Sequence, residues 1–118
     1  MCIWDYSQIY LIMTKYELEK FTRGWVVGDF SPSIIQSKDF EFMVHYYKSG
    51  DTEKCHVHKI ADEITVIVTG HFKMNDTELR AGDVVHLKPG EPSDFECISD
   101  GATAVVKTPS VTNDKYLI

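Results

Sequence analysis

The stretch GDTEKCHVHKIADEITVIVTG, from Gly50 to Gly70, decides the fold and carries the clearest chemistry. One residue separates His56 from His58, and Glu63 follows five residues later. Alternate side chains of a β-strand share one face, so a strand here directs both imidazoles to the same side. A turn at residues 59–62 would let Glu63 open a neighbouring strand beside them. Two imidazoles and one carboxylate suit Fe(II), Mn(II), Ni(II) or Zn(II) and leave coordination positions open.

Short β-type runs, separated by turn residues, surround this stretch. Many short strands without intervening helices predict an all-β sandwich or closed barrel rather than a parallel α/β sheet. Asn75-Asp76 lies between two such runs and predicts a tight two-residue hairpin. The strands we expect are residues 34–35, 40–47, 55–58, 63–69, 72–74, 84–87, 95–98 and 103–107.

The two ends of the chain differ from this β-rich region. Thr14 and Glu17 have the spacing of a capping box, and apolar residues follow at helical intervals, which predicts a short helix over about residues 15–22. Residues 1–12 are apolar and aromatic, and either come from an upstream start codon or form an extra strand that pairs with a neighbour. We therefore expect an arm with a short helix over residues 1–23 and one barrel domain over residues 24–118. The polar tail after Pro109 is expected to leave the barrel.

Bulk composition excludes several classes of partner. The 118 residues suffice for one domain and carry a formal charge of −6, with no run of Lys or Arg longer than two. Binding to nucleic acid or to an anionic membrane needs clustered positive charge, so neither is expected. Three widely spaced cysteines do not suggest a disulfide scaffold and favour a reduced, cytoplasmic protein.

With these residues in view, the chain resembles the cupin superfamily. The first cupin motif is Gly, five residues, His-x-His, three or four residues, Glu, six residues, Gly. Gly50, His56, His58, Glu63 and Gly70 match it at permitted spacing. The resemblance implies a double-stranded β-helix, a jelly-roll barrel, with a metal ion bound by the two histidines and the glutamate.

The second cupin motif is only partly present. Gly82 and Gly90 occupy its glycine positions, but Lys88 stands where proline is expected. Ser93 and Cys97 replace the histidine and the asparagine. Because that histidine is the usual fourth metal ligand in the superfamily, the resemblance supports the fold more strongly than it supports metal binding.

Other polar residues are weaker candidates for the site. His86 and Asp94 are possible fourth ligands, although strand alternation favours the outer surface for Asp94 and the plainer interpretation of His86 is a residue on the strand surface. Lys54 shares the alternation of His56, so it either reaches the same cavity and holds an anionic group there or is a solvated lysine at the rim. Tyr47 and Asp94 complete the candidate catalytic residues, with Lys54.

Two functions remain open at this stage. The first is a metal-dependent oxygenase, isomerase or lyase that acts on a small polar metabolite, a sugar derivative or carboxylate, in the barrel mouth. The second is a non-catalytic cupin that binds a small ligand as a regulatory or assembly module. Over about residues 24–116 the chain also resembles small uncharacterised cupin proteins of bacteria and phages, and the resemblance implies a homodimer.

Overall fold

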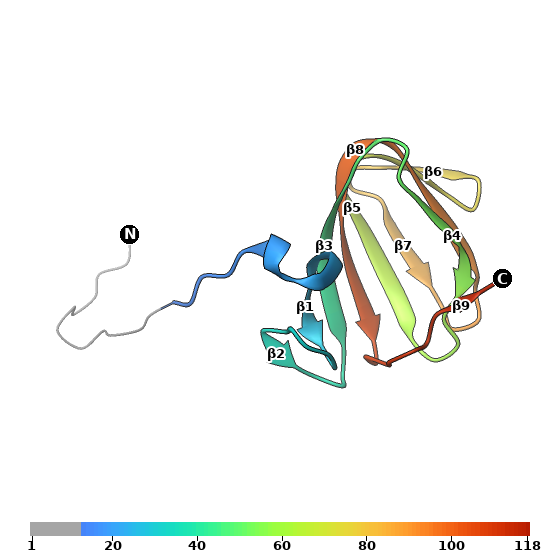
Figure 1. The fold of residues 1–118 in the computed structure, drawn as a ribbon. Helices are drawn as coiled ribbons and strands as arrows, with labels where there is room; N and C mark the ends of the chain where they lie inside the picture. Colours follow the sequence, from blue (N-terminus) through green and yellow to red (C-terminus); the bar gives the residue numbers. More distant parts are fainter. Residues whose placement is uncertain (1–12) are drawn as a thin grey trace.

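Two long strands, β5 (Asp62–Met74) and β8 (Ser93–Thr108), organise the fold in the computed structural model, which describes residues 13–118 (Figure 1). The first part of β8 pairs with β4 (Thr52–Val57) and its last part with β3 (Glu41–Tyr47). Strand β5 runs antiparallel to β8 along almost its whole length. The two long strands therefore pass through both walls of the barrel.

Shorter strands complete the two walls. The sheet order is β2-β1-β3-β8-β4-β9, and β5 pairs in addition with β6 and β7. These strands are β1 (Trp25–Gly28), β2 (Ile35–Gln36), β6 (Thr77–Arg80), β7 (Val84–Leu87) and β9 (Tyr116–Leu117). The all-β barrel predicted from the sequence is confirmed. Within residues 13–118, no helix is both long and apolar enough to cross a membrane.

The core fills one end of the barrel with aromatic and aliphatic side chains. Phe72 and Phe95 stack with ring centroids 5.0 Å apart, and Tyr47 packs edge-on against Phe72. The buried cluster consists of Tyr47, Ile67, Phe72, Met74, Leu79, Leu87, Phe95 and Cys97. Tyr47, Met74 and Phe95 of this cluster also border the cavity in which His56 and Glu63 of the predicted site lie.

The hairpin at Asn75-Asp76 forms as predicted. Asn75 and Asp76 have φ angles of 49° and 61° and connect β5 to β6, as a type I′ turn requires. Asp94 of β8 holds this turn, because its Oδ1 accepts a hydrogen bond of 2.8 Å from the Asn75 N–H. In return the Asp94 N–H donates to Oδ1 of Asn75 at 3.1 Å.

The short helix predicted over residues 15–22 is wrong. Two 3₁₀ turns, Leu18–Lys20 and Thr22–Gly24, stand in its place. An isolated helix of two turns is unstable unless packing supports it, and Arg23 and Gly24 have positive φ angles of 52° and 80° that end any helix there. The two interpretations of residues 1–12 lie outside the described residues.

The expectation that the C-terminal tail leaves the barrel is also wrong. Strand β9 pairs with the end of β4, opposite His56 and Val57. Before it, the buried Asp114 carboxylate accepts hydrogen bonds from the backbone N–H groups of residues 59–61, at 2.9 to 3.2 Å. The tail therefore closes over the turn between β4 and β5, next to the predicted site.

Candidate functional site in the barrel pocket

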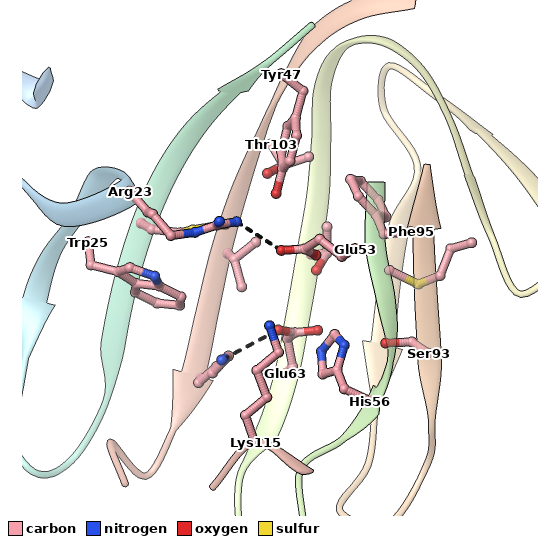
Figure 2. Close-up of a pocket in the computed structure, with 15 residues that line it drawn as sticks. Arg23, Trp25, Tyr47, Glu53, His56, Glu63, Ser93, Phe95, Thr103 and Lys115 are labelled. Carbon is pink, nitrogen blue, oxygen red and sulfur yellow. Dashed lines mark hydrogen bonds and ion pairs between the residues drawn. The ribbon is translucent and has the colours of Figure 1, made fainter. Parts of the chain in front are cut away.

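The open end of the barrel contains a cavity of about 250 Å³ (Figure 2). Three residues at cupin motif positions line it: His56, Glu63 and Ser93. Its other charged residues come from four segments and are Arg23, Glu53, Lys107 and Lys115. Its apolar wall consists of Trp25, Met43, Tyr47, Met74, Phe95 and Val105, together with the methyl-bearing Thr65 and Thr103. The cavity is therefore a charged mouth above an aromatic floor.

A β-bulge in β4 decides which side chains enter this cavity. Glu53 pairs with Phe95, whereas His56 pairs with Ser93, so the register shifts by one residue between them. One extra residue reverses the alternation of side chains. Glu53 faces the cavity, and Lys54, one candidate for that position, is exposed and does not line it. The interpretation of Lys54 as a solvated residue at the rim is the one that agrees with the structure.

His56 and His58 are both buried, and their ring centroids lie 5.1 Å apart. Nδ1 of His56 lies 2.9 Å from the Lys54 carbonyl oxygen, which can only accept, so this nitrogen carries the proton. In the neutral form of this imidazole the lone pair is therefore on Nε2. His58 lines a second, adjoining hollow, and Lys107 lines both hollows.

Lys107 is the central residue that the sequence analysis missed. In the sheet it stands opposite Glu41 of β3 on one side and Glu63 of β5 on the other. Its Nζ lies 3.9 Å from Glu41 Oε1, 4.0 Å from Glu63 Oε1 and 3.1 Å from His58 Nε2. The ammonium also lies 5.0 Å from the centre of the Trp25 ring, within cation–π range. We call Glu41, Lys107, Glu63 and His58 the lysine cluster.

Burial and the lysine together set the protonation of this cluster. Burial raises the pKa of Glu63 and of Glu41, and the positive charge of Lys107 opposes this in both. Burial, followed by the charges of Lys107 and His56, lowers the pKa of His58 to about 4. His58 is therefore neutral at pH 7, and its Nε2 accepts a hydrogen bond from the Lys107 ammonium.

As arranged, these side chains do not fit a metal ion. Among residues 13–118, no three His, Cys, Asp or Glu side chains converge so that they could hold one. A metal bound by His58 would lie about 2 Å from its nitrogen, but the Lys107 ammonium already approaches that Nε2 to 3.1 Å. The metal centre formed by His56, His58 and Glu63 stays a prediction.

Neither candidate for a fourth ligand lines the cavity. His86 lies on the outer surface of β7, where its Nε2 is 2.8 Å from Asp62 Oδ1. Asp94 points away from the cavity and holds the hairpin, as simple strand alternation requires. Tyr47 does line the cavity, and burial, followed by the charge of Glu53, raises the pKa of its hydroxyl. Tyr47 therefore stays protonated as a wall residue of the pocket.

Two residues that flank Gly24 reach the mouth, Arg23 of the N-terminal arm and Trp25 of β1, and no sequence motif marks either of them. Gly24 lies so close to β3 that a Cβ there would be 1.8 Å from the Val44 carbonyl oxygen. This close approach brings the flanking Arg23 and Trp25 to the cavity (Figure 2). Arg23 Nη2 forms an ion pair of 2.9 Å with Glu53 Oε1 across the mouth.

The folded tail brings Lys115 to the opposite side of the mouth. Asp114 is fixed by its backbone hydrogen bonds, and the next side chain, Lys115, extends over Glu63 and His56 (Figure 2). Among the described residues, no carboxylate oxygen lies within 4.0 Å of its ammonium. Burial raises the pKa of Glu63, and the charge of Lys115 is one of those that oppose this rise. The mouth thus contains an ammonium without an ion-pair partner from residues 13–118.

Comparisons with known proteins identify the architecture. No model of a known protein family and no curated protein matches the sequence. Several solved structures match in three dimensions. An uncharacterised conserved protein with a double-stranded β-helix domain from Klebsiella pneumoniae has a TM-score of 0.65 at 18% identity, covering 90% of this chain and 97% of that one.

Two enzymes have a similar fold. The DMSP lyase DddQ from Ruegeria pomeroyi has a TM-score of 0.66 at 22% identity, covering 79% of this chain and 49% of that one. Oxalate decarboxylase from Bacillus subtilis, a protein with Mn(II) centres, has a TM-score of 0.60 at 15% identity, covering 70% of this chain and 25% of that one. At these identities the likeness establishes the fold and leaves the chemistry open. The chain therefore has the double-stranded β-helix fold, as the resemblance of its first motif to the cupins implied.

Proposed function

We propose that the barrel cavity binds a small metabolite that carries a carboxylate group. The observation that carries this proposal is the ammonium of Lys115, which has no carboxylate partner among residues 13–118 and extends over the cavity beside His56. The volume of about 250 Å³ lies just below the range of roughly 300–1,000 Å³ that drug-sized ligands occupy, so a small molecule fits.

The lining offers each part of such a ligand a partner. Lys115 and the ion-paired Arg23 supply positive charge for a carboxylate at the mouth. Deeper in the cavity, the Ser93 hydroxyl and Nε2 of His56 suit a hydroxyl or carbonyl group of the ligand. Phe95 and the other apolar side chains support its carbon skeleton. In the neutral form of His56, Nε2 carries the lone pair and is the group best suited to accept a proton from a bound substrate.

A thermal-shift and calorimetric screen against small carboxylates, hydroxy acids and sugar acids tests this proposal. We expect at least one of them to raise the melting temperature, and Lys115→Met to weaken its binding about tenfold through loss of a charge-assisted hydrogen bond. Lys54→Met is the matched control, since this lysine lies outside the cavity and its loss should leave affinity unchanged. No ligand at millimolar concentration, or equal affinity in Lys115→Met and wild type, would argue against the proposal.

A metal-dependent enzyme acting on a small polar metabolite is the second candidate. It is favoured by the burial of His56, His58 and Glu63 and by the distance of 5.1 Å between the two imidazole rings. Such a centre would use Fe, Mn, Ni or Zn, and it requires the Lys107 side chain to withdraw from His58. Elemental analysis of protein purified without chelator separates the two candidates, since the metal-dependent enzyme should contain about one transition metal per chain.

We also propose that the protein is a homodimer that pairs through the outer face of the sheet β7-β5-β8. Ile64, Val68 and Val84 on this face are 37%, 49% and 61% exposed, and neighbouring apolar residues face outward beside them. Burying such a face stabilises association. Light scattering should give about twice the mass of 13.5 kDa, and Val84→Glu should shift the protein toward monomer. A monomeric wild type at high micromolar concentration would contradict this expectation.

A further inference from the structure

We propose that the Lys107 ammonium takes the position of a metal cation in this barrel, so that the lysine cluster is complete without a metal ion. The inference concerns the cation that holds the buried side chains together, and it does not depend on which ligand enters the cavity. It follows from the mismatch between the predicted metal ligands and the positions they occupy.

Sheet register fixes the lysine between its two carboxylates. Glu41 of β3, Lys107 of β8 and Glu63 of β5 stand directly opposite one another in one row across three antiparallel strands. Residues in such a row share a face and lie about 5 Å apart at Cβ, so the three side chains project together into the barrel. The backbone arrangement therefore places the base of the lysine side chain between those of the two glutamates.

The surroundings of the ammonium are those of a built cation site. The side chains of Lys107, Glu41 and Glu63 are only 16%, 14% and 12% exposed. Nζ lies 3.9 and 4.0 Å from carboxylate oxygens, 3.1 Å from the lone pair of His58 Nε2, and over the Trp25 ring. Carboxylates, a neutral imidazole and an aromatic face all favour a positive charge. These are also the carboxylate and imidazole groups that a transition metal would need.

A second cation in the same place is electrostatically unfavourable. A divalent ion bound by His58 and Glu63 would lie within a few ångströms of the ammonium, where repulsion between charges is strong because the site is shielded from water. The two carboxylates of the lysine cluster already have one positive charge between them, and the ammonium donates a hydrogen bond to Nε2 of His58. Metal binding therefore requires the loss or displacement of Lys107.

Metal titration of three proteins tests this inference. Wild type and Lys107→Arg, which keeps the charge, should bind no stoichiometric Zn²⁺ or Co²⁺. Lys107→Met removes the charge between His58 and Glu63, so that these side chains and His56 can turn toward a common point. This variant should bind about one ion per chain at least about 100-fold more tightly than wild type. In this variant Zn²⁺ should raise the melting temperature and Co²⁺ should give visible ligand-field bands. The additional His58→Ala change should abolish both effects.

Removal of the lysine could also prevent folding by leaving two buried carboxylates unbalanced. Lys107→Gln, which keeps a polar side chain, is therefore measured in parallel, and each variant is refolded with Zn²⁺ and with chelator. Recovery with Zn²⁺ alone supports the inference. A wild type that binds one metal ion per chain through His58 and Glu63, or a folded Lys107→Met or Lys107→Gln protein with no gain in metal affinity, overturns it. Ligand binding by wild type is scored separately, so failure of the proposed function is distinguishable.

Discussion

Alanine at Gly101 should lower the free energy of unfolding by about 4 kcal/mol, a large loss for a single methyl group. Gly101 lies in β8 at the bend of the barrel, against Thr69 and Gly70 of the paired strand β5. A Cβ there would lie 2.2 Å from the Thr69 carbonyl oxygen and 2.7 Å from Cα of Gly70. Both contacts are with backbone atoms, which cannot rotate away as a side chain can. The two strands must therefore move apart at this point.

Chemical and thermal denaturation measure this effect. For a chain of this length, a loss of about 4 kcal/mol corresponds to a fall in melting temperature of roughly 15 °C. Gly82→Ala is the matched control: its φ is 94°, but a Cβ would meet nothing within 4 Å. That change should cost only about 1–2 kcal/mol, the penalty of a left-handed conformation. Equal losses from the two substitutions would show that the strands do not lie so close together at Gly101.

Replacing Asp114 with asparagine should cost about 3 kcal/mol at neutral pH. The carboxylate accepts hydrogen bonds from the N–H groups of Lys59, Ile60 and Ala61. In asparagine an NH₂ group, itself a donor, would replace one of the accepting oxygens and point at these N–H groups. Because this contact holds the turn between His58 and Glu63, the change should also weaken ligand binding in the cavity. Asp76→Asn is the control, since this side chain is 99% exposed and should contribute less than about 0.5 kcal/mol.

The pH dependence of this difference identifies its cause. Burial alone raises the pKa of Asp114, but the backbone hydrogen bonds from residues 59–61 outweigh it and leave the pKa below its usual value. A carboxyl group whose pKa is depressed by folding stabilises the protein above its unfolded pKa of about 4, and this contribution is lost as the pH falls through the folded pKa. The gap between wild type and Asp114→Asn should therefore be constant above about pH 5 and narrow below pH 4. A gap that does not change with pH would mean that the carboxylate charge has no part in it.

The fold could be predicted because its determinants are local in the sequence. Short strand runs and turn residues predicted an all-β sandwich or closed barrel without any knowledge of pairing. The resemblance of Gly50, His56 and Gly70 to the first cupin motif implied the double-stranded β-helix. The turn at Asn75-Asp76 could likewise be predicted from adjacent residues alone. One strand was expected on each side of Gly70, over residues 63–69 and 72–74. The two form the single strand β5, because a bulged strand continues through a bend where the sequence pattern breaks.

The lysine cluster could not be predicted, because it depends on register between distant strands. Glu41, Glu63 and Lys107 are far apart in the chain, and nothing in their local sequence shows that they stand in one row. The bulge in β4 likewise exchanges Lys54 for Glu53 through a single extra residue. The alternation of side chains along β8 was the one available indication of an inward lysine. Thr103, Val105 and Lys107 are every second residue of this strand, and all three face the cavity. A lysine on the inner face of a predicted barrel strand is a reason to search for buried acidic partners.

The most direct measurement is an anomalous difference map from crystals of the wild-type protein soaked in Zn²⁺ or Mn²⁺. We predict no anomalous peak between the imidazole of His58 and the carboxylate of Glu63, and density for the Lys107 ammonium at hydrogen-bond distance from His58 Nε2. A strong peak at bonding distance from His56, His58 and Glu63, with the Lys107 side chain turned away, would contradict the account and establish a metal centre in its place.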